Sequence, residues 1–154
     1  MNYWLFKTEP DEFSIQQLAS SPNHTARWDG IRNYQARNFL RDRVQAGDLV
    51  LIYHGKIKQA GVVGTAQVVS PAYADPAQFD AGSPYYDPKS SGSAPRWFCI
   101  DIQWQDTFVE PVLLDWIKEQ HELSNMMLLK QGRLSVQLVT EPESRCILQK
   151  SQRR

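Results

Sequence analysis

Two apolar segments joined by a short connection constrain the fold of this chain more than any other feature. Residues 49–54 (LVLIYH) and 61–70 (GVVGTAQVVS) have the composition of strands, and segment 55–61 between them is typical of a hairpin. A short connection joins antiparallel neighbours, whereas parallel strands need a longer crossover. Gly61 and Gly64 inside the second strand predict a bulge or a close approach of another backbone.

The first of these strands has apolar side chains on both of its faces, because successive side chains of a strand point to opposite sides. One side carries Leu49, Leu51 and Tyr53, and the other carries Val50, Ile52 and His54. Tyr53 and His54 end the strand, at an edge of the sheet where ligands are often bound.

The rest of the chain interleaves strands with helices and loops. Strands are expected at 3–7, 96–108 and 134–140, helices at 9–20, 33–43, 113–123, 124–132 and 141–150, and loops at 21–30 and 71–95. Because several strands are adjacent, we predict a mostly antiparallel sheet curved into a small β-barrel with peripheral helices. The pattern contains no linker, so residues 1–154 are predicted to form a single α+β domain.

Length and composition place the chain among ordinary globular proteins. The chain has 154 residues, and no apolar run approaches the roughly 20 residues that a membrane helix needs. The N-terminus does not resemble a signal peptide, so we expect a cytoplasmic protein without membrane partners, and we expect a monomer. Cys99 and Cys146 are predicted to be reduced, buried thiols. The basic tail 150–154 is expected to be a solvated end.

The charge balance limits how the chain can bind nucleic acid. Lysine and arginine total 17, aspartate and glutamate also total 17, and the formal net charge is zero. A protein that coats nucleic acid by bulk electrostatics needs a basic domain, so this mode is disfavoured. A protein that captures one nucleotide in a pocket remains compatible with a neutral chain.

Motifs of the common catalytic and cofactor sites are missing from the sequence. The chain has no GxGxxG, no phosphate-binding loop and no GxSxG, and its histidines at 24, 54 and 121 are scattered. His121-Glu122 begins like a zinc protease motif, but the second histidine is absent. We therefore predict no catalytic residues, no metal and no cofactor.

The segment 28–43 (WDGIRNYQARNFLRDR) combines aromatic, amide and arginine side chains with little apolar content. Trp4, Phe98, Trp104 and Trp116 have apolar neighbours and are expected in the core. Trp28 differs, because Asp29 and Arg32 lie beside it at a loop-to-helix junction. An aromatic face, polar side chains and arginines are what a nucleobase pocket requires. Arg37 and Arg41 share one helix face, which is either a phosphate contact or a solvated stripe.

Seven motifs extend over almost the whole chain: 3–14 (YWLFKTEPDEFS), 28–41 (WDGIRNYQARNFLR), 47–54 (GDLVLIYH), 61–69 (GVVGTAQVV), 85–90 (YYDPKS), 95–97 (PRW) and 133–139 (RLSVQLV). In sequence and in order they resemble the motifs of the EVE domain. EVE domains belong to the PUA-like superfamily, together with YTH and ASCH domains. The resemblance implies a PUA-like curved, mostly antiparallel β-barrel with peripheral helices.

The resemblance also implies a pocket for one flipped base. It places Thr8, Glu9, Trp28, Asn33, Tyr53, His54 and Ser135 at the base, and Arg32, Arg37 and Gln137 at the phosphate or the rim. In this assignment Trp28 and Tyr53 are aromatic walls, and Glu9 and Asn33 read polar edges of the base. Leu138 stands where relatives commonly have proline, which affects that strand and not the pocket.

Several of these residues have a second, purely structural interpretation. Glu9 could be paired with an arginine, Asn33 could be the N-cap of the following helix, and Tyr53 could belong to the core. Trp97 either lines the pocket or only packs against its surroundings.

The implied function is non-enzymatic. The chain is expected to read a modified base in DNA, such as 5-methylcytosine or 5-hydroxymethylcytosine, by flipping it into the aromatic pocket. One alternative is recognition of a modified base in tRNA or another RNA. The other is a nucleotide-directed hydrolase like some ASCH proteins, for which Glu9 or Asp29 would be the general base.

Overall fold

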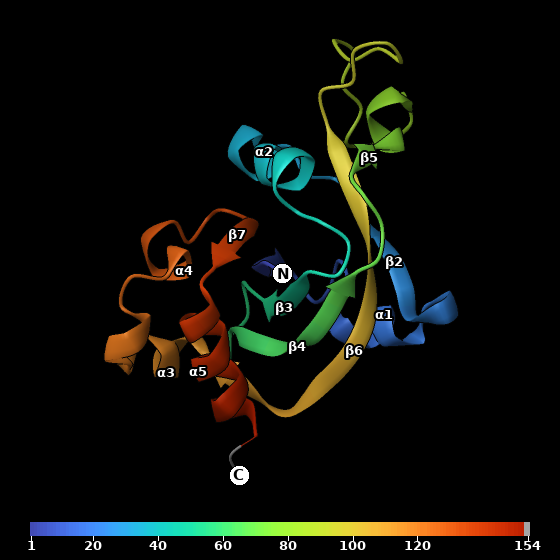
Figure 1. Cartoon of the computed structure of the whole chain (residues 1–154). Coiled ribbons are helices and arrows are strands. Elements are labelled where there is room, and N and C mark those ends of the chain that lie inside the picture. Colours follow the sequence, from blue (N-terminus) through green and yellow to red (C-terminus); the bar gives the residue numbers. More distant parts are fainter. Residues whose placement is uncertain (153–154) are drawn as a thin grey trace.

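The computed structural model describes residues 1–152, and its centre is one curved sheet (Figure 1). The strands are β1 (Tyr3–Thr8), β2 (Thr25–Trp28), β3 (Leu49–His54), β4 (Gly61–Val68), β5 (Tyr73–Ala74), β6 (Phe98–Leu113) and β7 (Val136–Val139). They follow the order β2-β6-β4-β3-β1-β7, and β5 pairs with one end of β6. The long strand β6 curves along one side of the molecule and carries β2, β4 and β5.

The sheet is mostly antiparallel, as predicted, but it is not a closed barrel. Every strand pairing is antiparallel except that of β1 with β3, which is parallel. Within residues 1–152, β2 pairs only with β6 and β7 only with β1, so both ends of the strand order stay open. The prediction of a barrel is corrected to an open, curved sheet because no hydrogen bonds join β2 to β7.

Short helices surround this sheet. They are α1 (Ile15–Ser20), α2 (Tyr34–Asp42), α3 (Leu114–Glu119), α4 (Met127–Lys130) and α5 (Glu141–Ser151), with 3₁₀ turns η1 (Pro22–His24), η2 (Pro76–Phe79) and η3 (His121–Leu123). All five predicted helical segments therefore contain a helix. Helix α5 begins with a capping box of Thr140 and Glu143 around Pro142. None of the helices in the described part combines the length and apolar character needed to cross a bilayer.

The two faces of the sheet contribute to separate cores. The first core contains Ile15 and Leu18 of α1 and Ala36 and Leu40 of α2. The second contains Ile117 of α3, Leu128 of α4 and Ile147 of α5. Strand β3 supplies both of them, with Val50 and Ile52 in the first and Leu51 and Tyr53 in the second. This confirms the predicted alternation and shows why the strand is apolar on both sides.

The aromatic and thiol side chains predicted to be buried are buried to different degrees. Trp4 is fully buried and Cys99 is buried. Phe98, Trp104, Trp116 and Cys146 are only partly buried. The indole rings of Trp104 and Trp116 pack against the margins of the two cores, so they cover core residues and do not fill the centre.

Several segments depart from the sequence prediction. Segment 71–95, expected as a loop, contains the short strand β5 and the 3₁₀ turn η2. Segment 21–30, expected as a loop, contains β2, which exists because it pairs with β6 in the register Trp28 to Ile100. Strand β6 continues to Leu113, five residues beyond its predicted end at Phe108. The basic tail 150–154 begins inside α5, and residues 153 and 154 lie outside the described part.

Gly64 confirms the predicted close approach of two backbones. A Cβ atom at this position would collide with the carbonyl oxygen of Asp106 and with the side chain of Ile15. The pairing of β4 with β6 shifts register on both sides of Gly64. Glycine is therefore required where β6 and α1 both press against β4.

The long segment 71–95 is organised by one buried glutamine. The Gln78 side chain is fully buried and donates to the carbonyl oxygens of Asp75 and Trp97, at 2.8 Å each. Its own oxygen accepts from the backbone amides of Arg96 and Trp97, at 3.0 Å each. Both ends of the segment are thereby held together.

Candidate functional site

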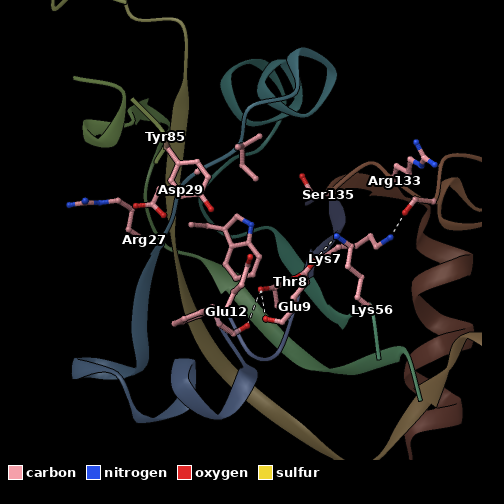
Figure 2. A pocket seen from close by; sticks show the side chains of 16 residues that line it. Lys7, Thr8, Glu9, Glu12, Arg27, Asp29, Lys56, Tyr85, Arg133 and Ser135 are labelled. Atoms are coloured by element: carbon pink, nitrogen blue, oxygen red, sulfur yellow. Dashed lines mark hydrogen bonds and ion pairs between the residues drawn. The ribbon is translucent and has the colours of Figure 1, made fainter. Parts of the chain in front are cut away.

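A cavity of about 1040 Å³ opens where the ends of several elements meet (Figure 2). Its lining comes from the end of β1 and the segment before α1, the end of β2 and the residues after it, the β3–β4 connection, the residues before β7 and Tyr85 of the long segment. Five of the residues that the sequence pointed to line it: Thr8, Glu9, Trp28 and Ser135 of the predicted base site, and Asp29 of the hydrolase alternative. The cavity thus collects residues that are far apart in the chain.

Trp28 forms the aromatic wall of this cavity. Its side chain ends β2, is only 7% exposed, and packs against the rings of Phe6 and Phe13 at centroid distances of 5.5 and 6.0 Å. These contacts hold the indole in one orientation. Among residues 1–152 no acceptor bonds the indole N–H of Trp28. The wall therefore offers a fixed apolar surface and one donor.

Tyr85 covers the cavity on the side of the β2–α2 junction. Gly30 adopts a φ of 75°, and a Cβ atom there would lie 2.9 Å from Cζ of Tyr85. The ring can rest on the chain at this position only because residue 30 has no side chain. Tyr85 is 39% exposed, so one part of its ring remains open to solvent.

Arg32 holds Tyr85 and the long segment in place. Its Nη1 lies 3.0 Å from Oδ2 of the fully buried Asp75, and its Nε and Nη2 donate to the carbonyl oxygen of Tyr85 at 3.1 and 2.8 Å. The guanidinium is also 5.4 Å from the ring centroids of both Tyr85 and Trp97. Its hydrogen-bonding capacity is directed to the protein, and Arg32 does not line the cavity.

The polar lining next to Trp28 comes from β1 and the residues that follow it. Thr8 donates from Oγ1 to the carbonyl oxygen of Phe13 at 2.9 Å. Glu9 is paired with Lys56 at 2.7 Å, rather than with an arginine. Burial raises the pKa of Asp29 above its ordinary value, and the nearby Asp75 carboxylate raises it further, while Arg27 opposes this shift.

The opposite end of the cavity is cationic. Lys7 donates from Nζ to the carbonyl oxygen of Gly132, and its Nζ lies 5.3 Å from the centroid of the Tyr53 ring. Burial lowers the pKa of Lys7, and the positive charge of Lys56 lowers it further. Arg133 and Ser135 complete this end of the lining (Figure 2).

Tyr53 and His54, expected at the pocket, lie inside the protein. Tyr53 is 2% exposed and belongs to the second core. The His54 ring is buried, and its Nε2 accepts the backbone amide of Ile15 at 3.1 Å. Burial lowers the pKa of His54, which keeps the ring neutral and able to accept. Neither residue lines the cavity, since both faces of β3 are covered.

Asn33, Arg37 and Gln137 also serve the fold. Asn33 is the N-cap of α2, and its side chain accepts the amide of Ala36 at 3.0 Å. Arg37 donates to the carbonyl oxygen of Arg96 at 2.9 Å. Gln137 is fully buried and donates to the carbonyl oxygen of Leu134 at 2.9 Å. None of the three is among the residues that line the cavity.

Trp97 packs and does not line the cavity. Its ring stacks on Tyr34 at a centroid distance of 4.8 Å, and its Nε1 donates to Oδ2 of Asp87 at 2.8 Å. In the described part of the chain, no three His, Cys, Asp or Glu side chains are grouped as a metal site would need.

Comparison with known proteins identifies the family. A family model described as the EVE domain matches residues 2–150. The chain belongs to the EVE domain family. This confirms the resemblance of the motifs. Thymocyte nuclear protein 1 of Mus musculus is 40% identical to this EVE domain over 164 residues, which cover 96% of this chain and 72% of the relative.

Solved structures share the fold of this EVE domain over its whole length. The structure of human THYN1 protein in complex with 5-methylcytosine containing DNA has a TM-score of 0.95 and 34% identity, covering 100% of this chain and 99% of that one. A Pseudomonas syringae protein has a TM-score of 0.90 and 41% identity, covering 97% and 99%. The architecture is therefore the PUA-like α+β fold of the family.

The lining residues of this EVE domain that were not singled out from the sequence include Lys7, Tyr85 and Arg133. Each lies inside a family motif, namely 3–14, 85–90 and 133–139. A lysine or tyrosine within a motif has many possible roles, and only the pairing of β1 with β7 brings Lys7 and Arg133 to one end of the cavity. In the sequence, membership of a family motif was the indication that these residues could matter. The fold shows which of the motif residues reach the cavity.

Proposed function

We propose that this EVE domain reads a modified nucleobase by holding one flipped base in the cavity against Trp28. The observation that carries the proposal is the fixed indole wall of Trp28 in a cavity that the polar side chains of Thr8 and Asp29 also line. A chain of the same fold along its whole length has been solved with 5-methylcytosine containing DNA, which favours this use of the cavity.

The energetics of the cavity suit base capture. Stacking on an aromatic side chain contributes about 1–3 kcal/mol per base, and extruding a base from a duplex costs a few kcal/mol. Hydrogen bonds at the edge of the base must supply the remainder. Carboxylates such as Asp29 and Glu9 accept from the amino group of cytosine. Both carboxylates line the cavity.

We propose binding without turnover. Glu9, a candidate general base, is held in an ion pair with Lys56. Asp29 has a raised pKa and lines the cavity, so it is the residue to test for hydrolysis. Absence of product from modified nucleotides and oligonucleotides incubated with the protein supports a reader. If the wild-type protein forms product and Asp29→Asn does not, the protein is a hydrolase and not a reader.

The direct test is a titration with matched oligonucleotides that differ only in one modified cytosine. We expect tighter binding of the modified duplex, and Trp28→Phe should reduce the preference because the larger ring surface is lost. Trp116→Phe is the matched control, since Trp116 lies on α3 and does not line the cavity. Equal affinity of the wild-type protein for both duplexes contradicts the proposal. Parallel titrations with modified RNA decide between the two nucleic acids.

A further inference from the structure

We infer that the cationic end of the cavity is a phosphate subsite, in which Lys7, Arg133 and Ser135 bind a phosphate of the nucleic acid strand that carries the flipped base. This inference rests on the proposed function, because it places the backbone of the same ligand. It extends that proposal by assigning the part of the nucleotide that the aromatic wall does not contact.

Cationic side chains gather at one end of the cavity. Lys7, Lys56, Arg133 and Ser135 lie together on one side of it, whereas Asp29, Tyr85 and the single cation Arg27 lie on the other (Figure 2). The carboxylate of Glu9 is already paired with Lys56. The ammonium of Lys7 and the guanidinium of Arg133 therefore face the same end of the cavity without a carboxylate partner of their own among the described residues.

Lys7 has the environment of an anion-binding group. Its ammonium has three N–H donors, and besides the ring of Tyr53 the structure gives it one hydrogen-bond acceptor, the carbonyl oxygen of Gly132. Burial and the neighbouring charge of Lys56 both lower its pKa, so the charged form is held in an unfavourable place. A bound anion would accept the remaining N–H groups and offset the repulsion between the two lysines.

Segment 132–135 is tied to Lys7, which positions Arg133 and Ser135 beside it. The carbonyl oxygen of Gly132 accepts from Nζ of Lys7, and the carbonyl oxygen of Ser135 accepts from the backbone amide of Lys7 at 2.9 Å. Arg133 lies between these two anchors and is exposed. No hydrogen bond or ion pair of the Arg133 side chain is formed within residues 1–152. Its fork of donors is free for a planar or tetrahedral anion.

A nucleotide matches the two ends of the cavity, with its base at one end and its phosphate at the cationic end. Aromatic and carboxylate groups at one end suit a base, and the phosphates of a nucleotide lie at a short distance from its base. Cationic side chains that contact phosphate position a strand but carry no sequence information. The subsite should therefore strengthen binding of modified and unmodified strands by the same factor.

The test uses the full chain with the 5-methylcytosine duplex, its unmodified match, and 5-methyl-2′-deoxycytidine with and without a phosphate. Arg133→Gln should weaken binding of both duplexes by about tenfold and reduce the slope of log affinity against log salt by about 0.7–0.9. Arg145→Gln removes the same charge from α5, outside the cavity, and should change neither quantity. Lys7→Gln, checked for folding by its thermal transition, should act like Arg133→Gln.

The outcomes separate this inference from the proposed function. An unchanged slope and unchanged affinities in both variants overturn the phosphate subsite, even if the modified base is still preferred. A wild-type protein without that preference, whose salt slope still falls in Arg133→Gln, retains the subsite and loses base reading. If the variants bind only the duplex more weakly, the phosphate belongs to a neighbouring nucleotide. If they also bind the monophosphate of 5-methyl-2′-deoxycytidine more weakly, the phosphate belongs to the flipped nucleotide itself.

Discussion

The phenol ring of Tyr85 rests on the backbone of Gly30, where a Cβ atom would lie only 2.9 Å from Cζ of the ring. Gly30 also has a φ of 75°, which side-chain-bearing residues rarely adopt. Two independent constraints therefore require glycine at the junction between the aromatic wall and α2.

Gly30→Ala is predicted to destabilise the protein by about 1–2 kcal/mol, because alanine is strained at this φ and displaces Tyr85. The free energy of unfolding in urea measures the loss. Gly92→Ala is the control, since no atom lies within 4 Å of a Cβ at Gly92 and its φ is not positive. Equal stability of the two variants would show that the contact with Tyr85 constrains nothing.

Arg32→Gln is predicted to destabilise the fold by about 2–3 kcal/mol and to loosen the segment around Tyr85. The Asp75 side chain is 0% exposed and loses its charged partner, while Arg32 itself is 21% exposed, which moderates the loss. Hydrogen exchange of the amides of Tyr85 and Gly30 should increase. The salt slope of DNA binding should stay unchanged, and a reduced slope with unchanged stability would make Arg32 a phosphate contact instead.

Stability is predicted to fall below pH 6.5 through His54. Burial lowers the pKa of His54 from 6.5, so the unfolded chain binds more protons between the folded pKa and 6.5. Stability present above pH 6.5 is therefore lost as the pH falls toward the folded pKa. Protonation also removes the acceptor for the Ile15 amide, a loss of about 1 kcal/mol.

The measurement for His54 is the free energy of unfolding at about pH 7.5 and about pH 5, compared between the wild type and His54→Gln. Glutamine keeps an acceptor near the position of Nε2 and does not titrate. The part of the acid destabilisation that is due to His54 should be missing in the variant. An identical pH dependence in both proteins would show that His54 does not contribute to the acid destabilisation.

Local sequence signals predicted most of the elements and part of the site. Strand alternation, Pro142 in the first turn of α5 and the glycines of β4 all act within a few residues, so they were visible in the sequence. Strand β2 was not, because a four-residue polar strand exists only by pairing with β6. The same holds for the open edge of the sheet, which depends on strands that fail to meet.

The site was only partly predictable for a related reason. Trp28 and Ser135 were recognised by residue type and motif, and both line the cavity. Tyr53 and His54 were expected at an edge of the sheet because they end their strand. In the structure, the helices on both sides of the sheet bury them. Lys7 and Arg133 meet only through the pairing of β1 with β7, a long-range contact that residue type does not reveal.

The most direct test of the central claim is whether binding draws one modified base out of the duplex. The affinity for a duplex with 5-methylcytosine opposite guanine is compared with that for the same base opposite a mismatched partner. Extrusion costs least for an unpaired base, so the mismatched duplex should bind about tenfold tighter, and Trp28→Phe should reduce this gain. Equal or weaker binding of the mismatched duplex would contradict capture of a flipped base against Trp28.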